Sequence, residues 1–325
     1  MIIAGFTNIR DGHHDNSVTL VRDGRIIYAS TEERFSRTKH DSSFPLQSLN
    51  DGLRRCGLTL ADIDYFATGW TEAPFTSGLF EPYPIAPLLT GLNLFLRRPL
   101  EVLKYARFRL GENLFRAPRA NTLVEMGVAP EKIIRLDHYH AHAASAYFTS
   151  GLERALAVCV DAMGTDTAGR LWSGGAYWCE DGRVTFLEHV PLHASMGLFY
   201  SAVTVMLGFT FNDGEWKTMG LSAYAKGNDA CVEAVRRLAP RFEDGHWVTH
   251  PGWTDYRIVE NAPLLRASAS GRALARLVEQ YGKEEIARAA QVVFEEEMLA
   301  YLRSLIEKTG AKSVVLAGGS FLNVK

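Results

Sequence analysis

The sequence lacks the features that mark several protein classes. Its 325 residues carry a formal net charge of −2, so no overall charge draws it to nucleic acid or anionic membranes. Its four cysteines are widely spaced and form no CxxC pair, which argues against a disulfide framework and a thiolate zinc site. The N-terminus is unlike a signal peptide, and the most apolar stretch, residues 85–96, is too short to cross a bilayer. We therefore predict a cytoplasmic protein without a nucleic-acid or membrane partner.

One pattern does occur twice in the chain. The first copy has an apolar run over residues 2–7, a polar turn, and two β-rich runs joined at Asp23-Gly24. The second copy has an apolar run over residues 156–161, the small polar turn MGTDTAG, and two β-rich runs joined at Asp181-Gly182. An Asp-Gly pair between β-rich runs is a strong hairpin signal. The repeat predicts two similar α/β halves on either side of a cleft that would hold ligands.

Helical patterns lie between and after the two copies. Residues 44–57 and 274–310 are amphipathic and end at glycines, which are natural helix C-caps. We predict a first half over residues 1–150, with a helical insert around 75–125, and a second half over residues 151–325. Because the sequence stops shortly after a strand and a Gly-Gly turn, we expect this second half to be truncated.

A cluster of histidines in DHYHAHAASAYF suggests a metal site. On a helix His138 and His142 share one face, while His140 is turned away. Two imidazoles four residues apart can hold one divalent metal, and Asp161 at the end of the second apolar run could add an oxygen ligand. Two histidines and a carboxylate suit Fe(II), Zn(II) and Mn(II) about equally. The alternative is an ordinary helix that carries an incidental histidine pair.

Three other stretches carry candidate chemistry. In HHDNS, His14 beside Asp15 could deprotonate a hydroxyl near neutral pH, although a polar hairpin explains the same residues. The charged stretch 31–45, which contains Lys39, suits a phosphorylated or carboxylated ligand, although a solvated loop is the usual explanation. The Gly318-Gly319 turn would let backbone amides approach an anion closely, which is weak evidence by itself.

Taken together, six stretches resemble the carbamoyltransferase family of nodulation-factor and antibiotic O-carbamoylation enzymes. They occur in the family's order across nearly the whole chain: HHDNS, DGRIIYASTEERFSRTKHDSSFP, DHYHAHAASAYF, VDAMGT, GEWKTMGLSAYAKG and LAGGSFLNVK. The stretches EERFSRTKHD and DHYHAHAASAY are the specific ones. The family usually has an HHxxH run, whereas here Tyr139 replaces the second histidine; the outer pair, His138 and His142, is retained.

The resemblance implies a fold, a reaction and a set of site residues. The fold would be a duplicated ribonuclease H-like fold of the actin-like ATPase type. The reaction would use ATP and carbamoyl phosphate to make carbamoyl adenylate, and then pass the carbamoyl group to a hydroxyl of a small-molecule acceptor. By motif match, the site residues are metal ligands His138, His142 and Asp161, with Fe(II) as the implied metal; nucleotide-binding Gly318, Gly319 and Asn323; and catalytic His14, Asp15 and Lys39. A further aspartate ligand and an adenylate-forming domain would follow Lys325, so we expect this piece alone to be inactive.

Three other functions use similar residues and stay open at this point. They are a tRNA threonylcarbamoyl-type acyltransferase, a sugar-kinase-like phosphotransferase and a non-catalytic nucleotide-binding module. The acceptor's identity cannot be read from the sequence, and a homo-oligomer is compatible with it.

Overall fold

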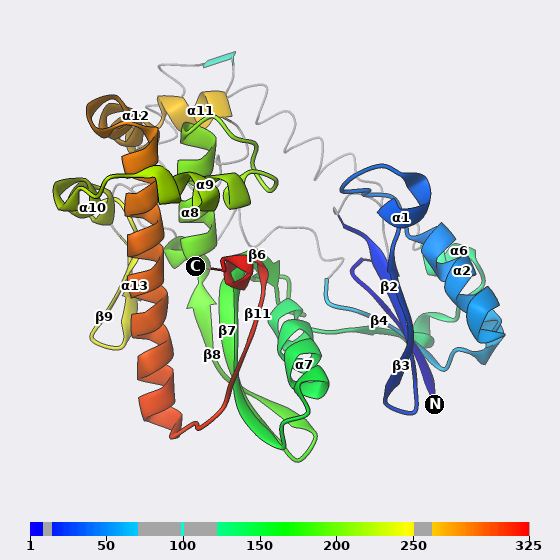
Figure 1. The fold of residues 1–325 in the computed structure, drawn as a ribbon. Coiled ribbons are helices and arrows are strands. Elements are labelled where there is room, and N and C mark those ends of the chain that lie inside the picture. Colours follow the sequence, from blue (N-terminus) through cyan, green and yellow to red (C-terminus); the bar gives the residue numbers. More distant parts are fainter. Residues whose placement is uncertain (9–14, 71–98, 101–121, 250–261, 325) are drawn as a thin grey trace. The chain divides into compact units, whose positions relative to one another are not determined.

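The computed structural model describes residues 1–8, 15–70, 99–100, 122–249 and 262–324 (Figure 1). These residues form two compact units. The first comprises the described parts of Met1–Thr76 and Gly111–Ala141 together with Thr165–Arg170, and the second comprises the other described residues. The predicted insert around residues 75–125 lies for the most part outside the described residues, and so does His14. The change from one unit to the other falls inside a helix, between Ala141 and His142, whereas the sequence suggested a division at residue 150.

The first unit contains a five-stranded sheet in the order β3-β2-β1-β4-β5. Its strands are β1 (Ile2–Phe6), β2 (Ser17–Arg22), β3 (Arg25–Thr31), β4 (Tyr65–Thr68) and β5 (Ile133–Arg135). Strand β2 is antiparallel to β1 and β3, while β4 is parallel to β1 and β5. Asp23 and Gly24 both have positive φ, which is the conformation of the two-residue hairpin turn that the Asp-Gly pair predicted.

Short helices surround this sheet, and one longer helix packs against it. They are α1 (Glu33–Ser36), α2 (Leu46–Cys56), η1 (Leu60–Asp62), α6 (Thr122–Glu125) and η2 (Pro130–Lys132). Helix α2 buries Leu49 and Leu53 in a core that includes Leu20 and Phe66. It ends at Gly57, which has a left-handed conformation, as the sequence predicted. The residues of one amphipathic face thus join the helix to the sheet.

The N-terminus of α2 depends on a buried acid from the charged stretch 31–45. Glu32 is 2% exposed, and its two carboxylate oxygens accept hydrogen bonds from the backbone amides of Gln47 (3.0 Å) and Ser48 (2.9 Å). These amides belong to the first turn of the helix, where no intrahelical acceptor is available. A negative charge at this end is also favoured by the helix dipole. Glu32 is therefore a structural residue, and not part of a solvated loop.

The second unit contains a four-stranded sheet in the order β11-β6-β7-β8. Its strands are β6 (Arg154–Thr165), β7 (Leu171–Glu180), β8 (Arg183–Pro191) and β11 (Val314–Ala317). Strand β11, red in Figure 1, is parallel to β6, and β7 is antiparallel to β8. Asp181 and Gly182 again both have positive φ, so the second predicted hairpin is confirmed.

Helices on the second unit enclose a larger core. The described part of this unit also contains a two-stranded sheet of β9 (Arg241–Glu243) and β10 (His246–Val248). The helices are η3 (Leu192–Ala194), α8 (Met196–Met206), α9 (Glu215–Leu221), η4 (Ser222–Tyr224), α10 (Asp229–Arg236), α11 (Ala262–Ala267), α12 (Ala269–Tyr281), α13 (Lys283–Thr309) and η6 (Gly319–Leu322). The helical pattern over 274–310 is thus two helices that meet at Gly282, which has a φ of 86°. Among the helices that the structure describes, none is both long enough and apolar enough to cross a membrane.

The two sheets repeat one strand order. In each sheet, its third, second, first and fourth strands in chain order lie side by side in that sequence, with the fourth strand parallel to the first. This is the order of the ribonuclease H-like fold, and its occurrence in both units confirms the predicted duplicated α/β fold class. The finer assignment of the halves to residues 1–150 and 151–325 stays a prediction.

Strand β6 is longer than the sequence suggested. It continues to Thr165, so Asp161 lies within the strand rather than at its end, and Met163 to Thr165 are not part of a turn. The turn is confined to residues 166–170. There Asp166 accepts hydrogen bonds from the amides of Ala168 and Arg170, both at 2.9 Å, and this carboxylate fixes the turn.

The Glu32 contact gives a stability prediction. Replacing Glu32→Gln leaves one acceptor oxygen and places an NH₂ donor against a backbone N–H, so we expect the free energy of unfolding to fall by about 1–3 kcal/mol. Chemical denaturation followed by circular dichroism measures this. Glu131→Gln, the same change at an exposed position of the same unit, should leave stability within about 0.5 kcal/mol of the parent. Equal stabilities of the two variants would contradict the capping role.

Candidate functional site

Helix α7 (His138–Ser150) carries the histidine motif. Its buried face consists of Tyr139, Ala143 and Tyr147, which follow one another at intervals of four residues. The small side chains of the motif let this face pack closely. Just before the helix, the Asp137 carboxylate accepts a hydrogen bond from the backbone amide of Thr167 (2.6 Å). Asp137 therefore joins the start of the helix to the turn after β6.

His138 and His142 lie on a second face of the same helix, next to the buried one. Together with Asp161 on β6, they offer three ligand atoms that all lie within 4.8 Å of one another. Nε2 of His142 and Oδ2 of Asp161 are 3.4 Å apart, and their side chains are 31% and 14% exposed. First-row divalent metals bind such nitrogen and oxygen atoms at about 2.0–2.2 Å, so a small contraction would let the three residues share one ion. This triad could hold a metal, and its two imidazoles and one carboxylate are a donor set that fits one.

Aromatic and apolar groups border the triad residues. The indole of Trp70 packs against the imidazole of His138, with ring centroids 4.5 Å apart. Behind Asp161, burial raises the pKa of the Cys159 thiol well above its usual range, and the Asp161 carboxylate adds to the effect. Burial at this position therefore favours the neutral thiol of Cys159.

The backbone at Asp161 and at the next residue is held by buried hydroxyl groups. Ser173 on β7 donates a hydrogen bond from Oγ to the carbonyl of Asp161 (3.0 Å). Ser195, the N-cap of α8, donates to the carbonyl of Ala162 (2.8 Å) and accepts from the amide of Leu198 (3.1 Å). The position of this part of β6 thus depends on contacts with two neighbouring elements.

The predicted catalytic residues Asp15 and Lys39 belong to the first unit. Asp15 Oδ1 lies 2.9 Å from Nδ1 of His40, which joins the loop before β2 to the charged stretch. Both residues have a positive φ near 60°, which is an uncommon backbone conformation for residues other than glycine. Lys39, next to His40, is exposed. His14 lies outside the described residues, so its predicted pairing with Asp15 stays a prediction.

The predicted nucleotide-binding residues belong to the end of the described chain. Gly318 follows β11 and packs against the backbone of Val160, while a Cβ added at Gly319 would lie 3.7 Å from the Cβ of Asp161. Asn323 and Gln291 exchange two hydrogen bonds between their amide groups, each of 2.9 Å. Tyr200 donates to Gln291 as well, at 2.7 Å. Gly318 and Gly319 thus lie close to the candidate ligand Asp161 and its strand, and the amide pair attaches Asn323 to helix α13.

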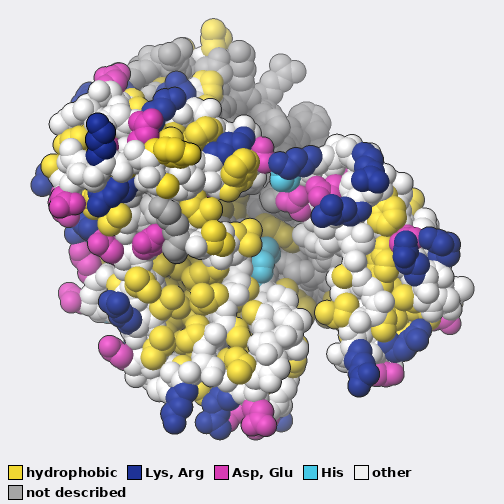
Figure 2. All heavy atoms as spheres, viewed as in Figure 1, with side chains coloured by type: hydrophobic (Ala, Val, Ile, Leu, Met, Phe, Trp, Pro, Cys, Tyr) yellow, Lys and Arg dark blue, Asp and Glu magenta, His cyan; other side chains and the backbone are white. Residues whose placement is uncertain are grey.

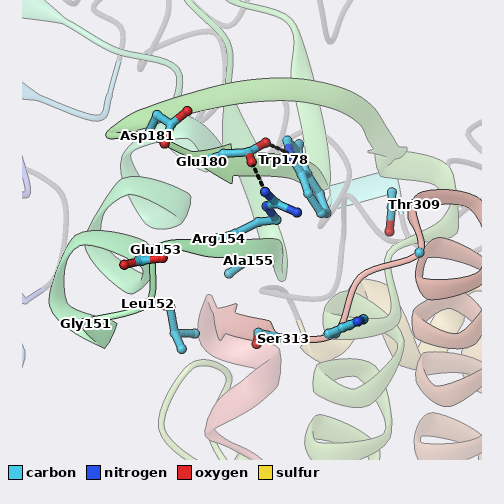
Figure 3. Close-up of a pocket in the computed structure, with 12 residues that line it drawn as sticks. Gly151, Leu152, Glu153, Arg154, Ala155, Trp178, Glu180, Asp181, Thr309 and Ser313 are labelled. Atoms are coloured by element: carbon cyan, nitrogen blue, oxygen red, sulfur yellow. Dashed lines mark hydrogen bonds and ion pairs between the residues drawn. The ribbon is translucent and has the colours of Figure 1, made fainter.

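A separate hollow lies at the other end of the second sheet (Figure 3). It encloses about 540 Å³ around the first residues of β6, the end of β7 and the C-terminus of α13. Arg154 forms an ion pair with Glu180, which also accepts a hydrogen bond from the Trp178 indole (3.0 Å). Arg154 is seven residues from Asp161, so roughly 23 Å of strand separates the hollow from the triad. None of the predicted site residues that the structure describes lines it.

The surface shown in Figure 2 carries positive and negative side chains mixed together. No patch of a single charge on that face therefore indicates another ligand surface.

Sequence reasoning did not find Trp70, Ser173, Ser195 or Gly197. No motif marks a serine whose hydroxyl donates to a backbone carbonyl of another strand. Gly197 could have been noticed, because a glycine in the first turn of an otherwise apolar helix is unfavourable unless close packing requires it.

One known family matches nearly the whole chain. The family model described as the carbamoyltransferase N-terminus matches residues 7–325. The uncharacterized protein sll1178 of Synechocystis is 31% identical over 322 residues, covering 96% of this chain and 50% of the relative. Nodulation protein NolNO of Sinorhizobium fredii is 30% identical over 308 residues, covering 94% of this chain and 40% of the relative. The chain thus spans half or less of the length of these two relatives. Among solved structures, component A of (R)-2-hydroxyglutaryl-CoA dehydratase from Acidaminococcus fermentans has a TM-score of 0.47 at 12% identity, covering 99% of this chain and 85% of that one.

The triad geometry predicts a metal site with a stoichiometry of one ion per chain. Asp161→Asn and His142→Ala should each weaken Mn(II) binding by more than about 100-fold, because even changes outside the ligand set typically cost 10–100-fold. Isothermal titration calorimetry measures these affinities. His140→Ala removes an imidazole from the same helix outside the triad, and it should bind Mn(II) as the parent does. Equal losses in all three variants would contradict the triad.

Proposed function

Because the chain belongs to the carbamoyltransferase N-terminus family, we propose that it supplies the metal-holding part of an O-carbamoyltransferase. The proposed reaction passes a carbamoyl group from carbamoyl adenylate, made from ATP and carbamoyl phosphate, to a hydroxyl of a small-molecule acceptor. The observation that carries this proposal is the convergence of His138, His142 and Asp161 within 4.8 Å in a member of this family. Since the two relatives compared above are about twice as long, the activity is proposed for the whole protein.

The triad would hold a divalent metal, for which the resemblance favours Fe(II). A metal ion bound there would supply Lewis-acid stabilisation of the negative charge that develops on oxygen during acyl transfer. The contribution of the chain is to hold two neutral imidazoles and one carboxylate at the spacing that such an ion needs. Helix α7 sets the distance between the two imidazoles, and β6 holds the carboxylate from a different element.

The other site residues are proposed to act on the substrates. His14 would take the proton of the acceptor hydroxyl, and Asp15 would orient that part of the loop. The pairing of Asp15 with His40 supports an ordered loop on one side of His14. Lys39 would neutralise the acyl phosphate, and it is a residue on the exposed surface of its unit.

Gly318, Gly319 and Asn323 are proposed to border the nucleotide. A strand followed by a glycine turn allows backbone amides to approach phosphate oxygens. The position of Gly319 beside Asp161 supports a nucleotide that lies next to the metal ligands. The side-chain amide of Asn323 already forms two hydrogen bonds with Gln291. To contact a nucleotide, Asn323 would have to break these hydrogen bonds and form new ones.

Carbamoyl transfer can be tested in the full-length protein. With ATP and ¹⁴C-labelled carbamoyl phosphate, we expect AMP release and label incorporation into members of a panel of hydroxyl compounds. Asp161→Asn should lower the transfer rate by at least about 1,000-fold, since it removes charge stabilisation at the reacting group, which commonly contributes 100- to 1,000-fold per group, and also the metal. His140→Ala serves as the control and should retain activity.

The same assay separates the rival functions. Transfer of the γ-phosphate of ATP to an acceptor would indicate a sugar-kinase-like phosphotransferase, and label in tRNA would indicate a threonylcarbamoyl-type enzyme. Binding of ATP without any transfer, unchanged by His138→Ala, would indicate a nucleotide-binding module. Each of these results would overturn the proposed O-carbamoyltransferase.

A further inference from the structure

Two glycines press against the part of β6 that carries Asp161, and both lie in the second unit. The first is Gly197, in the first turn of α8. A Cβ at Gly197 would lie 2.6 Å from the carbonyl oxygen of Asp161 and 2.8 Å from the amide nitrogen of Ala162. These are atoms of a strand backbone, so they cannot rotate away as the end of a side chain could.

The sequence itself indicates that this contact matters. Gly197 has no left-handed conformation that would require glycine, and glycine is a poor helix former compared with alanine. Helix propensity alone would therefore favour alanine at this position of α8, whose residues are mostly buried. Glycine occurs here because only a hydrogen atom fits between α8 and the backbone of Asp161.

The second glycine is Gly318, directly after β11. Its φ of 95° favours glycine, and a Cβ there would overlap the carbonyl oxygen of Val160. Strand β11 pairs with β6 as far as Ala317, which lies opposite Cys159. Just past that last pair, Gly318 lies against the backbone of Val160, one residue before Asp161. Only a hydrogen atom of the glycine fits at this contact.

We propose that Gly197 and Gly318 are positioning residues, which place the Asp161 carboxylate relative to His142. The inference rests on the proposed metal site. Real Cβ contacts essentially never fall below 3.0 Å, so an alanine at Gly197 would move α8 and β6 apart by at least about 0.4 Å. Metal and catalytic sites need their ligands within about 0.5 Å of the productive geometry. The minimum displacements, about 0.4 Å at Gly197 and about 0.6 Å at Gly318, are comparable with this tolerance, so a methyl group at either glycine would shift the carboxylate enough to weaken metal binding.

The test is Mn(II) affinity of the full-length protein, measured by titration calorimetry. We expect Gly197→Ala and Gly318→Ala to bind Mn(II) about 10- to 100-fold more weakly than the parent, the range typical of residues that orient metal ligands. A thermal melt of each variant, followed by circular dichroism, records the loss of stability separately. Retention of parental affinity, within about twofold, in both variants would overturn the proposal.

Two glycines elsewhere in the unit provide matched controls. Gly271 lies in the first turn of α12, after the N-cap Ser268, and a Cβ there would overlap the carbonyl oxygen of Leu265. Gly208 has a φ of 96°, close to that of Gly318, but its nearest neighbour to a Cβ is Lys283 Nζ at 3.8 Å. Gly271→Ala and Gly208→Ala should lower the melting temperature while leaving Mn(II) affinity unchanged. Equal loss of affinity in the controls would show a general effect of instability and overturn the positioning role.

Crystal structures of the metal-free proteins give a readout that is independent of the metal. In Gly197→Ala the separation of His142 Nε2 and Asp161 Oδ2, 3.4 Å in the parent, should increase, and in Gly271→Ala it should not. If the parent binds no Mn(II), the proposed metal function fails. The distance between His142 Nε2 and Asp161 Oδ2 in the variants would then still test whether the glycines position Asp161. If Gly197→Ala does not fold, Ser173→Ala removes the hydroxyl that donates to the Asp161 carbonyl at 3.0 Å and changes nothing else. It should weaken Mn(II) binding by about 10-fold, the lower end of the range for residues that orient metal ligands, and parental affinity in both Ser173→Ala and Gly318→Ala would overturn the proposal.

Discussion

The close packing of backbone around β6 is the constraint on which the second unit depends. Three elements contact the short stretch from Cys159 to Ala162 directly through main-chain atoms. Strand β7 approaches at Gly174, where a Cβ would lie 2.6 Å from the carbonyl of Cys159. Helix α8 approaches at Gly197, and the turn after β11 approaches at Gly318. Because backbone cannot repack as side chains do, these contacts fix the strand more firmly than hydrophobic burial alone. The carboxylate of Asp161 extends from this fixed stretch.

The candidate site residues of the two units lie on different kinds of element, although the two sheets share a strand order. In the second unit, the candidate ligands Asp161 and His142 sit on a central strand and on a helix, both of which are regular elements. In the first unit, Asp15 and Lys39 sit on connections, and side-chain contacts order those connections. His40 with Asp15, and Glu33 with the amide of His40, are examples. Regular elements suit a metal site that needs fixed distances, whereas loops suit groups that must adapt to a substrate.

The elements that sequence predicted correctly are those with a local cause. The Asp-Gly hairpins need positive φ at both turn residues, helix α2 ends at Gly57, and His138 and His142 share a helix face through the helical repeat itself. The extent of β6 was predicted wrongly, because MGTDTAG contains residues typical of turns while its first half pairs within a long strand. Tertiary pairing overrode local propensity there. The contacts of Ser195 and Gly197 with β6 could not be predicted, since they join segments that are more than thirty residues apart.

The motifs that gave the family resemblance combine chemistry with packing, and the structure separates the two. In DHYHAHAASAYF, His138 and His142 offer ligand atoms, whereas Asp137 holds the turn at Thr167 and Tyr139 lies in the core. In EERFSRTKHD, Glu32 caps α2 and Glu33 holds the backbone of His40. In LAGGSFLN, Gly318 packs on the strand that bears Asp161. A residue in such a motif therefore need not touch a ligand. Several of them instead hold the residues that could, so a motif match alone does not identify the reacting groups, whereas the contacts of each side chain do distinguish them.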